Sequence, residues 1–334
     1  MVFILNWFRK NKPFTNCYFE ISATHVKDVM ATDVMTVGRY DRLIDAAHIM
    51  IGAHISCLVV VDGEKPVGIL TERDFIKKLA MAKDHSSELL VNDLMTKELT
   101  TVNSHLTLFE AQKLMKAHKF RKLVVVEGEL LKGILTQTDL CKAVAKVKSS
   151  CPRSPVVKNV MTKAVLTVNG EEPFTKAKKI MASKDIGSVL VVEKGQIKGM
   201  FTEFDLVSEF FMNPNRLRSS YMKDLMTSPV ICISPDFDMF EVNRLMLEHN
   251  FRRLPVVDNG KLVGVITQTD VAWELYEFIE KNKNCADERL KRKQEEVKFA
   301  VKKTGSIILY SKFDEKKDGV QKDAEKKTMT EIME

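Results

Sequence analysis

Apolar runs and amphipathic stretches alternate along the chain in a pattern that occurs four times. In the first occurrence a short strand is predicted at 34–37, and apolar residues at helical spacing predict a helix over about 43–51. The wholly apolar run 58–61 predicts a buried strand, and Asp62-Gly63 predicts a hairpin turn into a second strand that ends at Leu70. A further amphipathic helix is expected directly after this strand.

Three more copies of this unit follow at intervals of 65, 66 and 65 residues. A repeat of this kind determines the fold prediction, which is an α/β chain of four β-α-β-β-α units. The corresponding apolar runs and turn glycines are 123–126, 189–192 and 254–257 with Gly128, Gly195 and Gly260. The predicted division is an N-terminal segment 1–25, repeats at 26–80, 91–145, 157–210 and 222–275, and a C-terminal segment 276–334.

A unit of about 55 residues encloses only a small core, so its apolar sheet needs cover from a neighbouring unit. We therefore expect the repeats to pair. A methionine stands at the same position of the first helix in every copy, and the simplest interpretation is that these side chains fill the core. They are Met50, Met115, Met181 and Met246.

The composition, with 45% hydrophobic and 29% charged residues, is typical of a soluble globular protein. The net charge of +7 is not concentrated in one tract and no nucleic-acid reading element is recognisable, so nucleic-acid binding has little support. Six cysteines are scattered without a C-x-x-C pair. A zinc site or disulfide framework is therefore not expected, and the cytoplasm is the expected location.

The two ends of the chain differ from the repeats. The apolar start 1–5 gives way to Arg9-Lys10 and is too short to span a bilayer. We expect it to dock on the first repeat, with a peripheral membrane anchor as the alternative. After Leu275 the sequence becomes strongly charged, which predicts a helix to about Lys303 and a disordered tail beyond Lys312.

Each copy carries Thr-x-x-Asp where the hairpin passes into the closing helix. One interpretation is a variant of the capping box, which normally uses Glu or Gln at the last position. The other is a nucleotide site, in which the helix start and the Thr hydroxyl attract phosphate and the ionised Asp accepts hydrogen bonds from ribose. Asp is less usual than Glu or Gln at the last position of a capping box, so its presence in all four copies favours the nucleotide site. The pairs are Thr71 and Asp74, Thr136 and Asp139, Thr202 and Asp205, and Thr267 and Asp270.

A methionine opens each repeat and a glycine precedes each motif by three positions, as in Met30 and Gly68 of the first copy. With these features about 250 residues resemble four CBS domains, an architecture similar to the gamma subunit of AMP-activated protein kinase and to stand-alone prokaryotic CBS proteins. The resemblance implies two Bateman modules, each a pair of repeats, in a disc-like arrangement. It also implies clefts for AMP, ADP, ATP or S-adenosylmethionine, with Asp at the ribose and Thr at the phosphate. The adenine would lie near the first strands, at Thr36, Thr101, Thr167 and Cys232.

The residues before each hairpin alternate between copies. Repeats 2 and 4 carry the basic pairs Arg121-Lys122 and Arg252-Arg253, where repeats 1 and 3 carry Ser56-Cys57 and Gly187-Ser188. The alternative for Lys122 is an ordinary solvated turn. From the resemblance we expect the basic pairs to reach phosphate in the partner clefts, those of Asp74 and Asp205, which should then bind most tightly. This expectation requires Glu72 and Glu203 to point to solvent.

The sequence contains no H-E-x-x-H, G-x-S-x-G or G-x-G-x-x-G motif, and the segments outside the repeats are too short for a catalytic domain. We therefore expect a non-enzymatic regulatory protein that senses energy state or a metabolite through an adenosine-containing ligand. Its expected partners are a regulated protein that the sequence does not identify and, as a further possibility, a second copy of the chain. The alternative is an interaction scaffold with structural CBS pairs and a partner-binding C-terminal helix.

Overall fold

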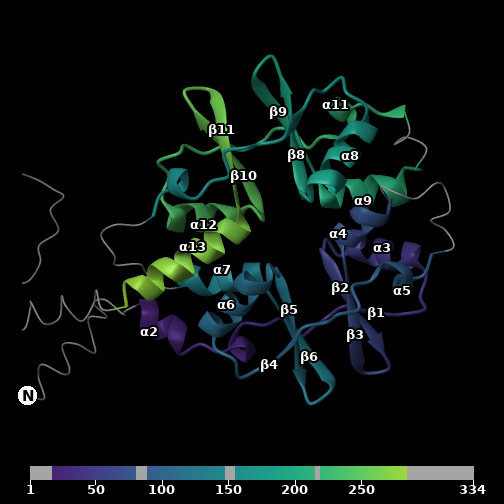
Figure 1. Ribbon diagram of the computed structural model, residues 1–334, viewed down its shortest axis with the longest axis vertical. Coiled ribbons are helices and arrows are strands. Elements are labelled where there is room, and N and C mark those ends of the chain that lie inside the picture. Colours follow the sequence, from purple (N-terminus) through teal and green to yellow (C-terminus); the bar gives the residue numbers. More distant parts are fainter. Residues whose placement is uncertain (1–16, 80–88, 147–154, 215–218, 284–334) are drawn as a thin grey trace, which may run out of the picture.

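The computed structural model describes residues 17–79, 89–146, 155–214 and 219–283. The apolar start of the chain lies outside these residues, as do the part of the charged C-terminal helix expected after 283 and the predicted tail. Each of the four repeats contributes an opening helical turn, a helix, a hairpin and a closing helix, and in repeats 1 to 3 a strand precedes the first of these helices (Figure 1).

Repeats 1 and 2 show this order in full. In repeat 1 the elements are η1 (Val26–Asp28), β1 (Thr36–Gly38), α3 (Leu43–Gly52), β2 (Cys57–Asp62), β3 (Lys65–Thr71) and α4 (Glu72–Leu79). In repeat 2 they are α5 (Val91–Leu94), β4 (Thr101–Asn103), α6 (Leu108–His118), β5 (Lys122–Glu127), β6 (Leu130–Thr136) and α7 (Gln137–Lys146).

Repeats 3 and 4 follow the same path. In repeat 3 the elements are η3 (Val157–Asn159), β7 (Thr167–Val168), α8 (Phe174–Lys184), β8 (Ser188–Glu193), β9 (Gln196–Thr202) and α9 (Glu203–Met212). In repeat 4 they are α11 (Met222–Leu225), α12 (Met239–Glu248), β10 (Arg253–Asp258), β11 (Lys261–Thr267) and α13 (Gln268–Lys281).

The first three repeats form three-stranded sheets in which the first strand runs parallel to the second and the hairpin is antiparallel. The β-α-β-β-α order expected from the sequence is confirmed there. Each hairpin turns at a glycine with positive φ, as predicted at Gly63, Gly128, Gly195 and Gly260. The four helix methionines are buried, with at most 1% of each exposed, as expected for core residues.

Repeat 4 departs from the expected order, because its described sheet has only the hairpin strands β10 and β11. The segment that should form its first strand makes a single parallel bridge, from Ile233 to Val256. The physical reason is Pro255, which occupies the place of Val59 in repeat 1. The amide of Val59 donates to the Met35 carbonyl at 3.3 Å, and proline has no N–H to make the corresponding bond.

The opening turn of each repeat was not predicted, and it packs on the partner repeat and not on its own. The amide of Val26 donates to the Leu106 carbonyl at 2.8 Å, and in return Val91 donates to the Asp41 carbonyl at 3.0 Å. Repeats 3 and 4 make the same exchange. Val26 and Val91 are fully buried in these positions, so two repeats form one folding module.

The methionine that opens each repeat lies against the glycine that precedes the motif of the partner repeat, which is why a glycine is needed there. A Cβ atom built on Gly133 would lie 2.7 Å from Sδ of Met30 and 2.8 Å from the Ala31 carbonyl oxygen, both in the partner repeat. The other three glycines face the opening methionines of their partners in the same way: Gly68 faces Met95, Gly199 faces Met226 and Gly264 faces Met161. Only a residue without a side chain lets the two sheets approach this closely.

The two modules meet through helices and form a disc with a central opening between four lobes (Figure 1). Repeat 1 contacts repeat 3 through α3, α4, α8 and α9, and repeat 2 contacts repeat 4 through α6, α7, α12 and α13. Each contact contains a core of buried apolar side chains. The N-terminal helix α2 (Cys17–Ser22) packs on the second of these contacts and buries Ile21 in it.

The first testable prediction concerns the close approach of the two sheets. In Gly199→Ala the new Cβ would lie 2.6 Å from Cγ and 2.8 Å from Cβ of Met226, so the module partners must move apart. We expect a loss of about 1–3 kcal/mol in the free energy of unfolding, measured by urea denaturation. The matched control is Gly52→Ala at the end of α3, where a Cβ meets nothing within 4 Å. Equal stabilities of the two variants would contradict this account.

Candidate functional site

The Asp of the Thr-x-x-Asp motif caps the start of the closing helix in all four repeats, and in repeats 3 and 4 the reciprocal capping box is complete. In each copy one oxygen of the Asp carboxylate, Oδ2, accepts from the backbone amide of the Thr at 2.7–2.9 Å and from its hydroxyl at 2.7 Å. In repeats 3 and 4 the hydroxyl oxygen also accepts from the Asp amide at 3.3 Å. The local interaction considered as the alternative from the sequence is therefore present.

This capping uses part of the motif and leaves part of it for a ligand. The one hydrogen of each Thr hydroxyl points to Oδ2, so a bond from Thr to phosphate requires the cap to open. The second carboxylate oxygen, Oδ1, takes no part in the cap. At Asp74 it lies 3.3 Å from the Thr96 hydroxyl, and at Asp139 it lies 3.9 Å from Nζ of Lys142. Burial raises the pKa of Asp205 and Asp270 above the ordinary value.

Every cleft combines residues from both members of a module. The segment before the first strand of one repeat pairs with the strand that leads into the motif of its partner, as in the bridges Ala31–Ile134 and Ile69–Thr96. Asp139 therefore belongs with the segment that leads to Thr36. The other combinations are Asp74 with the segment before Thr101, Asp270 with that before Thr167, and Asp205 with that before Cys232.

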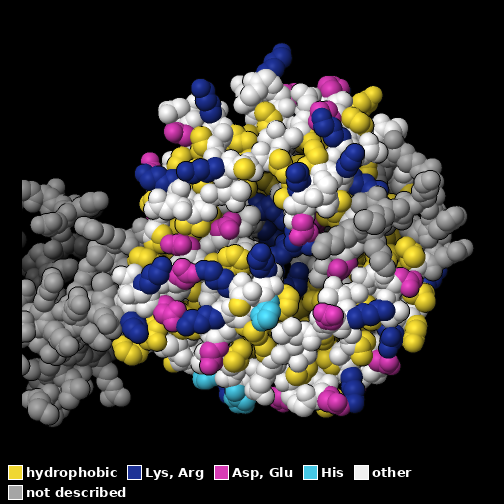
Figure 2. All heavy atoms as spheres, viewed as in Figure 1, with side chains coloured by type: hydrophobic (Ala, Val, Ile, Leu, Met, Phe, Trp, Pro, Cys, Tyr) yellow, Lys and Arg dark blue, Asp and Glu magenta, His cyan; other side chains and the backbone are white. Residues whose placement is uncertain are grey.

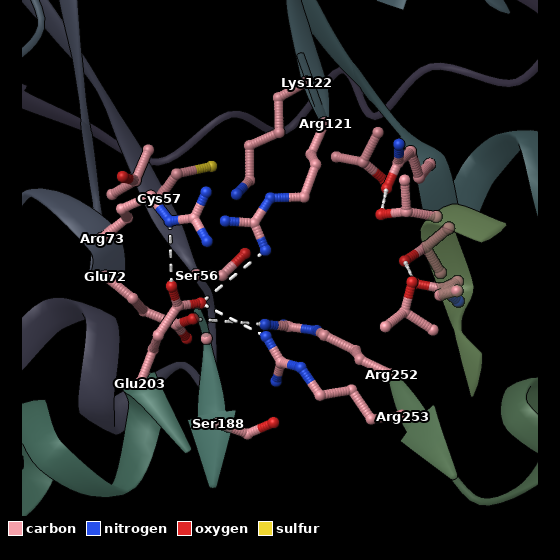
Figure 3. A pocket seen from close by; sticks show the side chains of 18 of the residues that line it. Ser56, Cys57, Glu72, Arg73, Arg121, Lys122, Ser188, Glu203, Arg252 and Arg253 are labelled. Carbon is pink, nitrogen blue, oxygen red and sulfur yellow. Dashed lines mark hydrogen bonds and ion pairs between the residues drawn. The ribbon is translucent and has the colours of Figure 1, made fainter. Parts of the chain in front are cut away.

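A cavity of about 740 Å³ occupies the centre of the disc and is lined by all four repeats (Figures 2 and 3). Several predicted site residues line it: Thr71, Thr136, Asp139, Thr267, Arg121, Lys122, Arg252 and Arg253. Asp74, Thr202, Asp205 and Asp270 are not among its lining residues, nor are the four predicted adenine-side positions at Thr36, Thr101, Thr167 and Cys232. These last four are exposed, and residues just before the first strands, such as Val34 and Val165, reach the cavity instead.

Seven ionisable side chains gather in this cavity, and Figure 3 shows them pointing toward one another. We refer to them as the central charge cluster. It consists of Arg73, Arg121, Lys122, Arg252, Arg253, Glu72 and Glu203. The cluster holds five cations and two carboxylates, and Arg73 also pairs with Asp185 of the cavity lining at 3.4 Å, so a net positive charge remains that attracts anions.

Glu203 is the centre of this cluster. Its side chain is 3% exposed and lies within 4 Å of three guanidinium groups: Arg73 at 3.2 Å, Arg253 at 3.4 Å and Arg121 at 3.7 Å. A Cβ on Gly187 would lie 2.7 Å from Oε2 of Glu203 and would collide with the Arg253 guanidinium, so this glycine makes the pairing possible. Glu72 has one ion pair, with Arg252 at 3.5 Å, and is also buried.

The two carboxylates differ in their electrostatics. Burial favours the neutral acid at both. At Glu203 the three guanidinium groups outweigh burial and hold the pKa below the ordinary value of 4.5. At Glu72 burial prevails over the partial compensation by Arg252 and Lys122, and the pKa is raised. One oxygen of Glu72, Oε1, is buried and has no hydrogen-bond partner within the described residues.

Two expectations from the sequence are wrong on this geometry. Glu72 and Glu203 do not point to solvent but are buried among the arginines. Arg121 and Arg252 do not turn to their own module, because Arg121 pairs with Glu203 of repeat 3 and Arg252 with Glu72 of repeat 1. The second basic residue of each pair does lie near its module partner, since Lys122 acts electrostatically on Glu72 and Arg253 on Asp205.

The even repeats meet across the cavity through neutral side chains. The Thr138 hydroxyl donates to Oε1 of Gln268 at 2.9 Å, and the Thr269 hydroxyl donates to Oε1 of Gln137 at 2.6 Å. These Gln residues stand at the motif position that Glu72 and Glu203 hold in the odd repeats. In the sequence the Gln/Glu difference alternates together with the basic pairs, but ion pairs between Glu72 or Glu203 and these pairs were not predicted.

Comparison with known proteins agrees with this architecture. A protein-family model described as the CBS domain matches residues 26–81, 91–146, 157–211 and 222–277, which is more than half of the chain. The chain belongs to the CBS-domain family. The paired repeats are therefore Bateman modules, as the sequence suggested.

Several relatives and solved structures match about three quarters of this chain. The uncharacterized protein MJ1404 of Methanocaldococcus jannaschii is 27% identical over 264 residues, which cover 74% of this chain and 60% of that protein. The crystal structure of MJ1225 from the same organism, described as a proposed archaeal homolog of g-AMPK, has a TM-score of 0.67 at 18% identity and covers 75% of this chain and 99% of that one. An uncharacterized conserved protein from Pyrococcus horikoshii has a TM-score of 0.53 at 22% identity, with 75% and 98% covered. These two structural matches support the fold.

Two further properties bear on what this CBS protein binds. Within the described segments, no helix is long and apolar enough to cross a membrane. Among the same residues, no group of three or more His, Cys, Asp or Glu side chains is placed to hold a metal ion.

The second prediction compares the two buried carboxylates. Glu203→Gln leaves three guanidinium groups without their anion, and we expect a loss of about 3 kcal/mol in the free energy of unfolding at pH 7. Glu72→Gln removes a charge whose pKa is already raised, so its stability should change by less than about 1 kcal/mol.

Urea denaturation between pH 3 and pH 8 tests both statements. A pKa that is lower in the folded than in the unfolded state gives stability that is present above pH 4.5 and lost as the pH falls below it. The difference between the wild type and Glu203→Gln should therefore shrink below pH 4.5. A larger loss for Glu72→Gln than for Glu203→Gln at pH 7 would contradict this assignment of charges.

Proposed function

We propose that this CBS protein is a non-enzymatic regulatory protein that binds an adenosine-containing ligand between paired repeats. AMP, ADP and ATP are the ligands that suit the cavity best, and S-adenosylmethionine is the alternative. One observation carries the proposal: the Asp139 carboxylate, with its Oδ1 outside the capping box, lines the same cavity as the guanidinium groups of the central charge cluster. A ribose acceptor and a phosphate site are thus continuous.

The apolar part of the cavity supports the same class of ligand. Met35 is 48% exposed and Leu166 is 37% exposed, and both line the cavity at equivalent positions of repeats 1 and 3. Exposed apolar side chains of this size beside an anion site suit the flat face of a base. The cavity therefore offers partners for all three parts of a nucleotide.

A sensing role follows from where the ligand would bind. The clefts lie between partner repeats and the cavity lies between modules, so a bound nucleotide contacts surfaces that move relative to one another when the disc changes shape. The regulated partner would be another protein or a second copy of this chain. A reducing compartment such as the cytoplasm suits the free thiols of Cys57, Cys141 and Cys232.

The third prediction concerns stability in the presence of ligand. AMP or ATP at about one hundred times its dissociation constant should stabilise the nucleotide-free protein by about 2.7 kcal/mol per site. The measurement is a thermal-shift series with AMP, ADP, ATP and S-adenosylmethionine, with guanosine monophosphate as the control for base recognition. If none of the adenosine ligands raises the melting temperature, the scaffold interpretation is favoured and the sensor proposal fails.

The fourth prediction separates the ribose acceptor from the helix cap. In Asp139→Asn the amide oxygen can still accept the two capping bonds, but the charged acceptor for ribose is gone. We expect an unchanged free energy of unfolding and an affinity at that cleft about ten- to one-hundred-fold lower by calorimetry. A loss of stability with unchanged affinity would show that Asp139 serves the cap alone.

A further inference from the structure

The central cavity does not extend equally toward the four clefts. On the side of repeat 2 it is lined by the whole motif from Thr136 to Asp139, together with Val34 and Met35 of the partner segment. On the side of repeat 4 it is lined by Thr267, Gln268, Thr269 and Trp273 with Val165 and Leu166 of the partner segment, whereas Asp270 lies outside the lining. From the clefts of Asp74 and Asp205 it receives the motif residues Thr71, Glu72, Arg73 and Glu203 but no residue of the partner segments before Thr101 and Cys232. The cavity is therefore continuous with the two even clefts.

The residue after the motif threonine also differs between the odd and the even repeats. It is Glu72 or Glu203 in the odd repeats and Gln137 or Gln268 in the even ones. A phosphate at the helix start of an odd repeat would lie beside a buried carboxylate and would also compete with it for the arginines. At the even helix starts the corresponding side chain is a neutral amide, which does not repel phosphate.

The arginines themselves are anchored beside the even clefts. The amide of Gln137 donates to the Arg121 carbonyl at 3.1 Å, and that of Gln268 donates to the Arg252 carbonyl at 2.9 Å. The guanidinium groups of both reach carboxylates only at 3.7 and 3.5 Å, and the side chains are 37% and 45% exposed. These long, partly solvated pairs can exchange a carboxylate for a phosphate at little cost.

Donors without a partner point to the same side. Nε2 of Gln137 and Nε1 of Trp273 are buried and have no hydrogen-bond partner within the described residues. Both residues line the cavity and both belong to even repeats. A buried donor of this kind is costly unless a ligand or water satisfies it.

We propose that Glu72 and Glu203 act as built-in counter-anions that exclude phosphate from the clefts of Asp74 and Asp205. The chain then binds two phosphate-bearing adenosine ligands, in the clefts of Asp139 and Asp270, with their phosphates at Arg121 and Arg252. This inference rests on the proposed function and deepens it, and it reverses the alternation expected from the sequence. An adenosine ligand without phosphate can still bind in the clefts of Asp74 and Asp205, because it brings no charge that the carboxylates repel.

The test is calorimetric titration of the full, nucleotide-free chain with AMP. We expect two sites in the wild type and one site in each of Asp139→Asn and Asp270→Asn. Asp74→Asn and Asp205→Asn should keep both sites, and the loss of a site in either would overturn the inference. Three or four AMP sites in the wild type would overturn it as well.

Exchanging the amide and the carboxylate tests the cause directly. Glu72→Gln should add a third AMP site, which Asp74→Asn in the same chain should remove, and it should leave adenosine binding unchanged. The reciprocal Gln137→Glu should weaken AMP at the Asp139 cleft at least tenfold, while urea denaturation shows that the variant is folded. If Glu72→Gln and Gln137→Glu leave the number of AMP sites unchanged, the exclusion is wrong although the sensor proposal stands. If no adenosine ligand binds the wild type, both proposals fail.

Discussion

The contact between the sheets of partner repeats is the interaction on which the rest of the structure depends. Val59 and Val124 meet there and are almost completely buried, and Ile134 joins them. The two sheets approach this closely because the opening methionine of one repeat packs against a glycine of its partner, which has no side chain. The same contact carries the segment before each first strand to the motif of the partner, so no repeat has a complete cleft by itself. Packing and site are thus consequences of one interface.

The electrostatics at the centre depend on a second, smaller difference between the modules. Arg253 is held against Glu203 because Gly187 leaves room for it. Repeat 1 has Ser56 at the corresponding place, and there Lys122 acts on Glu72 electrostatically. Three guanidinium groups outweigh the desolvation of Glu203, but Glu72 has one guanidinium at longer range. Two carboxylates at equivalent positions therefore have pKa values shifted in opposite directions.

The sequence allowed the elements and their repetition to be predicted, because periodicity, turn glycines and the repeated Thr-x-x-Asp are local signals. It did not show the exchange of opening turns, which depends on which surfaces meet, nor the loss of the first strand in repeat 4. That loss could have been inferred from Pro255, which occupies a position where repeats 1 and 3 use a backbone N–H, that of Val59 and of Leu190. The pairing of Glu72 and Glu203 with Arg252 and Arg121 was harder to infer. Alternating acidic and basic positions suggest complementarity, but only the arrangement of the modules shows that the pairs cross the disc.

The crossing of these pairs makes the two modules thermodynamically dependent on each other. Arg121 belongs to one module and its carboxylate to the other, and the same is true of Arg252. Any anion that takes an arginine away from its carboxylate changes the free energy of the contact between modules. By reciprocity, whatever alters that contact from outside must alter the affinity for the anion by the same factor. Three ion pairs join the modules: Arg73–Glu203, Arg121–Glu203 and Arg252–Glu72. Through them, occupancy of a cleft and the relative position of the two modules become one equilibrium.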